Sequence, residues 1–504
     1  MTSRPVTRRR VLAGIATLGP LAVLRSGRAQ SVDPFALGVA SGCPRPERIV
    51  LWTRLVVPGA PQAIPDMPVP VEWELAEDEQ FRRIAARGTA TAEPRFGHSV
   101  HVEPDGLSPS RWYWYRFRAL GAESPVGRTR TASERGTSPS WFRFAFASCQ
   151  MYEHGHYAAY RHMAAQDLDL VVHLGDYIYE LSWGNRKVRR HEGAVPTELW
   201  EFRDRYALYK GDPHLRAAHA AFPWLAIWDD HEVSNDHWRD GAPNLRDPAL
   251  FRRVRAAAYQ AWWEHMPVPA SMAPVEGAMR IHERYRFGDL LDLMLLDCRQ
   301  HRSPPACRGG TSDCDERTAA DRTMLGAEQE AWLDRSLGEG GGRWTILAQP
   351  TLMAQQDRRA GPERAFRMDG WDGYPAARGR LLSSIHRHRP PNPVVIGGDV
   401  HAFWVADLKQ DFDDPSAPTL ASELVGSSIS SEGPAEANVR AWLAENPHLK
   451  YGRGDKRGYV RLDLDPRRCR ATFLGVDDVA NPTSNVEPIA MFTIEDGKAG
   501  AMPG

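Results

Sequence analysis

The pattern of apolar and polar residues changes once along the chain, near residue 135. Before that point, short segments alternate apolar and polar residues and are separated by Gly, Pro and Ser. Alternation with a period of two is typical of strands with one buried face. The clearest segments are 48–55, 71–75, 99–102 and 112–118. Because no long helical pattern interrupts them, the sequence predicts an all-β sandwich of fibronectin type III-like character over 36–135.

Beyond a boundary rich in Ser, Gly, Thr and Pro, apolar runs of strand length alternate with segments of helical periodicity. The predicted strands are 142–147, 168–174, 225–228, 290–296, 344–348, 394–396 and 458–464. The predicted helices lie near 155–166, 197–210, 249–264, 325–338 and 376–387. This alternation predicts a layered α/β domain over 140–475, with largely parallel or mixed sheets flanked by helices. Residues 476–504 form a separate C-terminal segment in this interpretation.

The first 29 residues differ in charge from the rest of the chain. They hold six arginines and no acidic residue, and an apolar run over 11–24 follows Arg8, Arg9 and Arg10. That run is too short to span a bilayer comfortably. The pattern is typical of an export signal, and the twin arginine resembles a Tat signal. We therefore expect export by the Tat machinery to the periplasm or the exterior, with no integral membrane segment in the mature protein. A basic disordered tail is the alternative.

Composition narrows the classes of function. The chain of 504 residues is 42% hydrophobic and 25% charged, which fits a folded protein with a large core and excludes a disordered or fibrous one. Without the first 29 residues, 57 basic residues face 64 acidic ones, so we expect no stable nucleic-acid partner. Six cysteines are too few for a disulfide framework. Cys307 and Cys314 flank a Gly-rich loop and are the expected pair.

Polar residues of the kind that bind metals follow strand after strand in the α/β region. Sheets of this class bind ligands at the carboxyl ends of their strands. Any one of these motifs has an ordinary structural explanation, such as a turn or a helix cap, but five of them recur at the same end of successive strands. They are Ser148-Cys149-Gln150, Gly175-Asp176, Asp229-Asp230-His231-Glu232, Gln349 and Gly397-Gly398-Asp399-Val400-His401.

Closely spaced carboxylates repel one another unless a cation neutralises them. Four aspartates and two histidines in these motifs therefore indicate bound metal ions. They are Asp176, Asp229, Asp230, Asp399, His231 and His401. Two metal ions together can activate water and stabilise both the attacking and the leaving oxygen of a phosphoryl group. Hydrolysis of a phosphate ester is the reaction that this pattern favours.

The order of these motifs resembles that of the calcineurin-like metallophosphoesterases, and Tyr179 stands where purple acid phosphatases also place a tyrosine. Longer strings resemble the PhoD-type alkaline phosphatases over roughly 36–470. These strings are Phe146 to Gln150, His173 to Glu180, Trp228 to Val233, Gly397 to Trp404 and Val425 to Ser431. The resemblance implies a sandwich followed by a four-layer metallophosphoesterase domain that hydrolyses phosphate mono- and diesters with Fe³⁺ and Ca²⁺.

The resemblance also implies roles for single residues. It assigns Fe³⁺ to Cys149, Asp176, Tyr179 and His401. It assigns Ca²⁺ to Asp176, which would bridge the two ions, and to Asp230, Asp399 and the weaker ligand Asn235. In this scheme His231 faces the phosphate, and His231 and Asp230 are the catalytic residues.

Carboxylates here replace an Asn and a His of the wider superfamily, and hard oxygen ligands suit calcium better than zinc.

Several alternatives stay open at this stage. Phospholipase D-like or nucleotide-specific phosphodiesterase activity would fit the same metals, and a non-catalytic envelope binding protein would fit the sandwich. His154 and His156 either line the pocket or belong to a structural helix start. Arg299, His301 and Arg302 either contact phosphate or form an exposed basic turn. The loops 181–197, 233–247 and 355–375 are expected to decide substrate choice.

Overall fold

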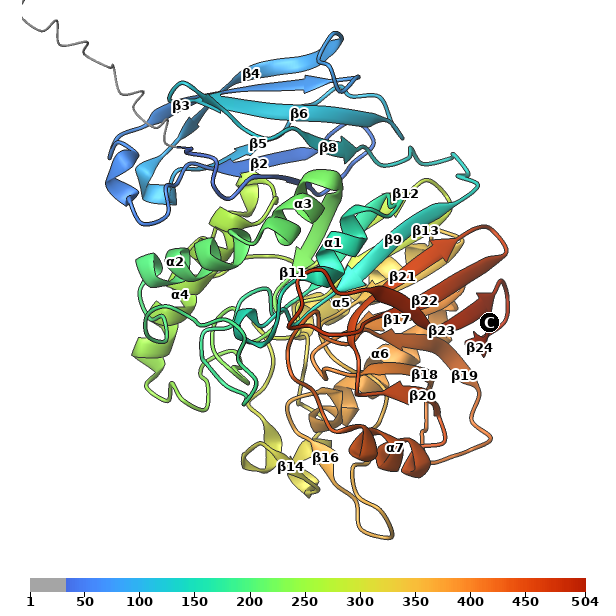
Figure 1. Cartoon of the computed structure of the whole chain (residues 1–504). Coiled ribbons are helices and arrows are strands. Elements are labelled where there is room, and N and C mark those ends of the chain that lie inside the picture. The colour runs from blue at the N-terminus through green and yellow to red at the C-terminus, as the bar shows by residue number, and fades with distance from the viewer. Residues whose placement is uncertain (1–32) are drawn as a thin grey trace, which may run out of the picture. The chain divides into compact units, whose positions relative to one another are not determined.

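A ten-stranded sheet is the largest element of the computed structural model, which describes residues 33–504 (Figure 1). The expected export signal at 1–29 lies outside the described residues. The strand order is β24-β23-β22-β21-β9-β10-β11-β1-β2-β5. Its parallel centre consists of β9 (Phe142–Ala147), β10 (Leu170–Leu174), β11 (Pro223–Ile227) and β1 (Val39–Gly42). Antiparallel strands flank this centre: β2 (Val50–Arg54), β5 (Ser99–Val102), β21 (Arg457–Leu464), β22 (Arg468–Val476), β23 (Val486–Glu495) and β24 (Met502–Pro503).

A seven-stranded sheet packs against the first one. It consists of β12 (Glu283–Phe287), β13 (Leu291–Leu295), β15 (Trp344–Ala348), β17 (Pro393–Gly397), β19 (Thr419–Val425), β18 (Phe403–Lys409) and β20 (Leu449–Arg453), in that order. From β13 to β19 the strands are parallel. One buried cluster contains Phe144 and Val172 of the first sheet and Leu293 and Ile396 of the second. The two sheets therefore share a core.

Residues 33–504 contain seven α-helices, which flank the sheets (Figure 1). They are α1 (Ala158–Ala164), α2 (Leu199–Lys210), α3 (Pro213–Ala221), α4 (Pro248–His265), α5 (Ala327–Glu339), α6 (Pro375–His388) and α7 (Glu436–Glu445). The Asp212 carboxylate caps α3 by accepting hydrogen bonds from two backbone N–H groups, and Pro213 begins that helix. Asp247 and Pro248 begin α4 in the same way. The five predicted helices and all seven predicted α/β strands are confirmed, and α3 and α7 were not predicted.

The predicted sandwich is present, but one of its two layers belongs to the ten-stranded sheet. The outer layer consists of β4 (Ile84–Ala92), β3 (Val69–Ala76), β6 (Trp112–Ala119), β7 (Ala122–Glu123) and β8 (Gly127–Arg130). The inner layer consists of β1, β2 and β5, and the two layers share a hydrophobic core. Residues 476–504 were expected to form a separate segment, but their strands β23 and β24 extend the ten-stranded sheet, so both ends of the described chain are tied to it.

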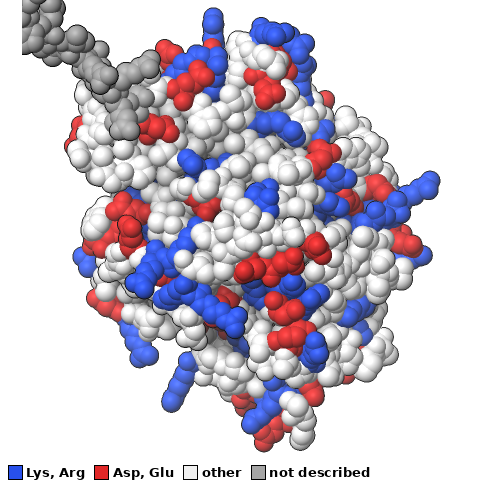
Figure 2. All heavy atoms as spheres, in the orientation of Figure 1, with Lys and Arg blue, Asp and Glu red and all other residues white. Residues whose placement is uncertain are grey.

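Three further features complete the fold. The predicted pair Cys307–Cys314 forms a disulfide next to the small sheet of β14 (Thr311–Ser312) and β16 (Phe366–Arg367), and the other four cysteines are reduced and buried. Charged side chains of both signs are interspersed over the face seen in Figure 2. None of the helices in the described part of the chain is long and apolar enough to cross a membrane.

Candidate metal and phosphate-binding site

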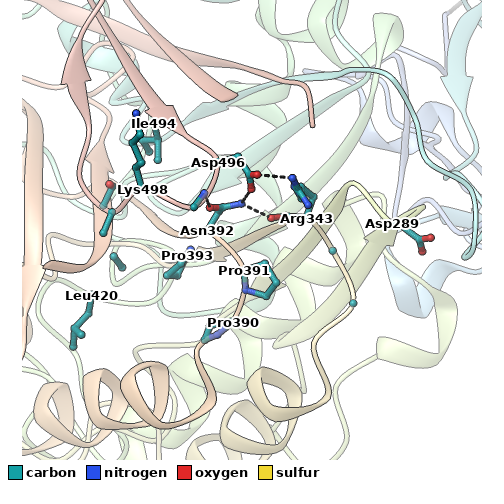
Figure 3. A pocket seen from close by; sticks show the side chains of 16 residues that line it. Asp289, Arg343, Pro390, Pro391, Asn392, Pro393, Leu420, Ile494, Asp496 and Lys498 are labelled. Atoms are coloured by element: carbon teal, nitrogen blue, oxygen red, sulfur yellow. Dashed lines mark hydrogen bonds and ion pairs between the residues drawn. The ribbon is translucent and has the colours of Figure 1, made fainter. Parts of the chain in front are cut away.

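The parallel strands have two edges, and each edge has a cavity. At the amino ends of β15 and β17 a cavity of about 620 Å³ is lined by Arg343, Asn392 and Asp496 (Figure 3). There Asp496 accepts hydrogen bonds from the Arg343 guanidinium and from Asn392 Nδ2, so the polar groups pair with one another. At the carboxyl ends a cavity of about 600 Å³ is lined by Asp176, Asp230 and other predicted ligands. The candidate site is therefore the cavity at the carboxyl ends, as the position of the motifs predicts.

Sharp turns at the strand ends direct the predicted ligands into this cavity. Cys149, Asp176, Asp399 and His401 all have positive φ, between 51° and 61°, which is uncommon for residues other than glycine. Gly175, with φ 100°, allows the turn at Asp176, because a Cβ there would lie 2.4 Å from the backbone nitrogen of Asp229. Backbone strain of this kind is concentrated at functional sites.

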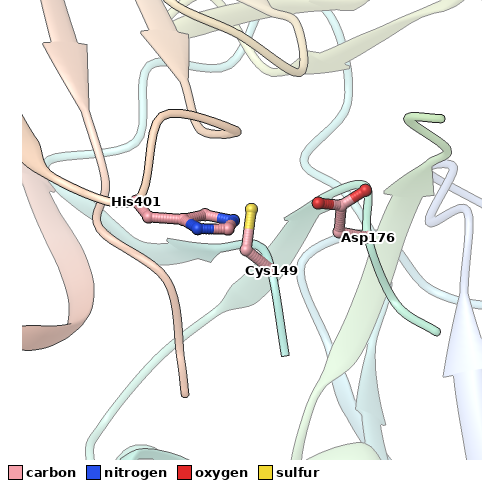
Figure 4. Close-up of side chains that lie close together, drawn as sticks. All are labelled: Cys149, Asp176 and His401. Atoms are coloured by element: carbon pink, nitrogen blue, oxygen red, sulfur yellow. The ribbon is translucent and has the colours of Figure 1, made fainter. Parts of the chain in front are cut away.

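Four predicted iron ligands converge in the cavity, and we call them the thiol cluster: Cys149, Asp176, Tyr179 and His401. Ligand atoms of Cys149, Asp176 and His401 all lie within 4.8 Å of one another, and their side chains point toward the same space (Figure 4). The Tyr179 hydroxyl donates to Asp176 Oδ2 at 2.8 Å and lies 3.2 Å from His401 Nε2. His401 Nδ1 is bonded to the Glu432 carbonyl oxygen at 2.5 Å, which leaves Nε2 to face the cluster.

The protein alone does not stabilise charge in the thiol cluster. Burial, with the Asp176 carboxylate as the next cause, raises the pKa of the Cys149 thiol well above its usual range. Burial also raises the pKa of Tyr179 and of Asp176, and lowers the pKa of His401 to about 3. Asp176 Oδ1 is buried and has no hydrogen-bond partner among the described residues. A cation would oppose the three raised pKa values and occupy that oxygen, and the neutral His401 imidazole is already in the form that binds a metal. The donor set therefore fits a metal ion.

A second group of acidic residues lies beside the first, and we call it the carboxylate cluster: Asp229, Asp230, Asp236, Asp369 and Asp399. Ligand oxygens of Asp230, Asp236 and Asp369 lie within 4.8 Å of one another. Asp399 Oδ2 accepts a hydrogen bond from Thr351 at 2.7 Å. Ligand-type atoms of Asp176, Asp230 and His231 also lie within 4.8 Å, which connects the two clusters through Asp176.

Arginines compensate much of the charge in the carboxylate cluster. The Arg299 guanidinium binds Asp229 and makes two bonds to Asp369, at 2.8 and 3.0 Å. Arg302 adds a bond to Asp369 at 2.6 Å. Burial opposes ionisation of Asp230 and Asp369, but Arg299 holds the pKa of both carboxyls below the usual value. Both arginines are fully buried and ion-paired. They therefore form neither an exposed basic turn nor a contact surface for phosphate, the two alternatives left open by the sequence.

His231 lines the cavity between the two clusters. Its Nδ1 is bonded to Glu180 Oε2 at 2.7 Å, and Glu180 Oε1 accepts from the Asn235 backbone N–H at 2.7 Å. Burial disfavours an imidazolium, but Glu180 and Asp230 raise the pKa of His231 well above its usual range. Asn235 also lines the cavity, as predicted for a ligand of the second ion. Gln349 instead bonds to Thr351 and Trp371.

His154 connects two segments that flank His401. Its Nδ1 accepts from the Glu432 backbone N–H at 3.0 Å, and its Nε2 bonds to the Trp183 carbonyl oxygen at 2.8 Å. The Trp183 ring stacks on His401, with centroids 5.7 Å apart. Gly184 lies so close that an added Cβ would be 2.3 Å from His154 Nε2. His154 is therefore buried behind the cavity, where it supports a predicted ligand.

Sequence reasoning missed several residues of this site. Glu180 is the last residue of the string from His173 that resembles the PhoD-type phosphatases, and this position beside Tyr179 was the only sequence feature that pointed to it. Arg367 ends the short strand β16 and Asp369 follows it, outside the strands of the α/β core, so the strand-end pattern did not identify them. Arg367 lies 3.4 Å from Asp399 and lines the cavity.

Comparisons with known proteins agree with this geometry. Residues 144–473 match the family model of the PhoD-like phosphatases, and residues 22–133 match the model of their N-terminal domain. Alkaline phosphatase D of Bacillus subtilis (strain 168) is 42% identical over 479 residues, which cover 93% of this chain and 82% of that protein. A solved structure of PhoD superposes with a TM-score of 0.90 at 41% identity, covering 94% of this chain and 92% of the other.

A more distant structure shows the same fold. A purple acid phosphatase from yellow lupin (Lupinus luteus) seeds matches with a TM-score of 0.57 at 12% identity, covering 91% of this chain and 74% of that one. At this identity the match supports the architecture alone. The predicted fold, layered sheets flanked by helices and preceded by a β-sandwich, is confirmed by both structures.

Proposed function

Because this chain belongs to the PhoD-like phosphatase family and is a metal-dependent phosphoric ester hydrolase, we propose that it hydrolyses both phosphate monoesters and diesters with Fe³⁺ and Ca²⁺. The observation that carries the proposal is the junction of two clusters at Asp176, which places one carboxylate within reach of both ions. One cluster offers a thiol, a phenol and an imidazole. The other offers only oxygen ligands.

The donor types assign the two ions. Cys149, Asp176, Tyr179 and His401 are the proposed ligands of Fe³⁺, because a buried phenol and a buried thiol lose their protons together only beside a strong Lewis acid. Asp176, Asp230, Asp399 and Asn235 are the proposed ligands of Ca²⁺, a hard cation that prefers oxygen. When bound, the ions neutralise the carboxylates, polarise the phosphoryl oxygens and activate water.

The remaining chemistry belongs to His231, which with Asp230 forms the proposed catalytic pair. Glu180 fixes the imidazole through Nδ1, so that the ring is oriented where it lines the cavity. Glu180 raises the pKa of this imidazole, and the protonated ring can donate a hydrogen bond to a phosphoryl oxygen or a proton to the leaving oxygen. Asp230 supports that charge and supplies a carboxylate oxygen to the second ion.

The place of action is proposed from the first 29 residues. Their twin arginine and apolar run support export through the Tat machinery, and the enzyme would then act on small phosphate esters in the periplasm or outside the cell. Export of a folded chain suits a protein whose metal is loaded before it leaves the cytoplasm. Deleting residues 1–29, or replacing Arg8 and Arg9 by lysine, should keep the enzyme inside the producing cell, and secretion that continues unchanged would contradict this proposal.

Metal content and turnover test the activity together. Purified enzyme should contain iron and calcium by elemental analysis, and should hydrolyse 4-nitrophenyl phosphate and bis(4-nitrophenyl) phosphate. Removing metal should abolish both activities, and adding back Fe³⁺ with Ca²⁺ should restore them. An enzyme that is active without iron, or that hydrolyses only one of the two ester types, would contradict the corresponding part of the proposal.

A further inference from the structure

One wall of the catalytic cavity has no part in the proposed metal chemistry. It is formed by Gln356 and Arg358, from the segment after β15, and by Trp442 of α7. These three side chains line the same cavity as the predicted calcium ligands Asp230 and Asp399. A substrate whose phosphate lies on the metal ions would therefore have its alcohol part within the same 600 Å³ space.

Gln356 presents a buried hydrogen-bond donor that lacks an acceptor. Its side chain is 2% exposed, and its backbone N–H donates to Asp372 Oδ2 at 2.9 Å. Its Oε1 accepts from Arg358 Nε at 3.0 Å, so the oxygen of the amide is used. Its Nε2 has no partner anywhere in residues 33–504. Because a buried donor without a partner is unfavourable, this amide indicates that a ligand oxygen binds here.

Arg358 presents a cation that forms no close ion pair among the described residues, although Asp372 and Asp399 lie near enough to raise its pKa. Its guanidinium lies over the Trp442 ring, 4.7 Å from the centroid, and no acidic side chain of the described chain pairs with it within 4.0 Å. Burial lowers the pKa of Arg358 to about 10, so the group is still charged at neutral pH. Arg367, the other arginine of this cavity, differs because it faces Asp399 and Asp369.

The wall is held in place before any ligand binds. Asn446 lies just after α7 and makes two hydrogen bonds of 2.8 Å to the backbone of Asp357. Its Oδ1 accepts from the Asp357 N–H, and its Nδ2 donates to the Asp357 carbonyl oxygen. This pair of bonds joins the segment that carries Gln356 and Arg358 to the helix that carries Trp442. A preorganised site loses less entropy when it binds a ligand.

We propose that Gln356 and Arg358 form a subsite for a second oxyanion, carried by the alcohol part of the ester. The inference rests on the proposed phosphate-ester hydrolysis and specifies its substrate class: esters whose alcohol carries a carboxylate or a further phosphate, in preference to uncharged alcohols. The Trp442 ring forms an apolar wall beside this oxyanion. The amide donor and the guanidinium together supply charge-assisted hydrogen bonds, which an uncharged group does not match.

Two matched aryl esters test the subsite. 4-Carboxyphenyl phosphate and 4-carbamoylphenyl phosphate have nearly the same size, but only the first carries a second anion. We expect the ratio of their kcat/KM values, carboxylate over carboxamide, to fall by about tenfold or more in Arg358→Gln holoenzyme. Comparing ratios between enzymes cancels the difference in leaving-group chemistry. The matched control is Arg359→Gln, an arginine that is 59% exposed and paired with Glu363, and the ratio should stay as in the wild type.

A second variant keeps the test decisive if Arg358→Gln does not fold. Gln356→Glu preserves the side-chain size and places a carboxylate beside Arg358, which neutralises the guanidinium, so the same ratio should fall. If either variant folds and its ratio equals that of the wild type, the inference is overturned. This includes an equal slowing of both esters, which would show that Arg358 binds the scissile phosphate instead. Wild-type enzyme that hydrolyses neither ester would contradict the proposed function instead.

Discussion

The thiol cluster and the carboxylate cluster share one cavity, but the protein treats their charges differently. In the thiol cluster the Tyr179 hydroxyl bonds to Asp176 and His401, and no arginine or lysine of the described chain forms an ion pair with the Asp176 carboxylate. In the carboxylate cluster, Arg299, Arg302 and Arg367 face the aspartates. The first cluster therefore needs a metal ion to become charged, whereas in the second Arg299 keeps the Asp230 and Asp369 carboxylates charged.

This difference suggests a division of roles. The thiol cluster would determine which ion is bound, since its donors are neutral until a strong Lewis acid displaces their protons. The carboxylate cluster would hold a weaker, harder ion in a frame that exists before binding. Substitutions at single residues can test this contrast.

The largest effect is expected at Asp176, the residue common to both sets of ligands. Asp176→Asn removes the charge that two cations would share, so iron and calcium should both become substoichiometric and kcat should fall by more than about 10³-fold. Elemental analysis and turnover of a chromogenic ester measure these quantities. Full iron occupancy with normal turnover would show that Asp176 does not bridge the two clusters.

His231 should separate chemistry from metal binding. His231→Ala removes the protonated imidazole but none of the proposed ligands, so kcat should fall by about 10² to 10⁴-fold while iron and calcium are retained. The same two assays apply. Metal loss in parallel with activity would make His231 a ligand, as its position near Asp176 and Asp230 also allows.

Arg299 tests the claim that the carboxylate cluster is stabilised by the protein. Arg299→Leu removes the guanidinium that pairs with the buried charge of Asp369 and binds Asp229, and the free energy of unfolding should fall by about 3–5 kcal/mol. Denaturant unfolding of metal-depleted protein measures this loss. The matched control, Arg335→Leu on the exposed face of α5, should change stability by about 0.5 kcal/mol or less. Similar stabilities of the two variants would contradict the claim.

His154 tests whether the thiol cluster depends on residues behind it. His154→Leu removes the bonds to Glu432 and Trp183, and the affinity for iron should weaken by about 10- to 100-fold. His154→Gln offers both an acceptor and a donor, and should recover part of the affinity. Competition with a chelator measures it. If Leu and Gln variants bind iron equally well, the histidine acts through packing alone.

The smallest structural change is the loss of one hydroxyl in Tyr179→Phe. If the phenolate and the Cys149 thiolate bind Fe³⁺, the enzyme should absorb visible light through charge transfer, and the variant should lose or shift that band at matched iron content. Absorption spectra of the two proteins compare this directly. An unchanged band would show that Tyr179 is not a ligand, and a colourless active wild type would overturn the ferric assignment.

Much of the fold and half of the site follow from local sequence. The strands β9, β10, β11 and β17 were predicted because short buried strands leave a clear apolar run. Their ends carry Cys149, Asp176, Asp230 and His401, and parallel strands bring such ends together. The helices α3 and α7 were missed: α3 follows α2 after only two residues and leads directly into β11, and the apolar pattern of α7 is weak, with one buried residue, Val439.

What the sequence determined by itself is therefore the set of strands, the edge at which they meet and the ligand types delivered there, because periodicity and chain direction are local properties. Only the tertiary structure decided how those ligands are balanced and supported. Arg299 binds Asp229 and Asp369 across 70 residues in each direction, and His154 reaches Glu432 across 278. Such pairs form only when distant elements pack together. Burial makes each pair important, because a buried charged or polar group without its partner is energetically costly.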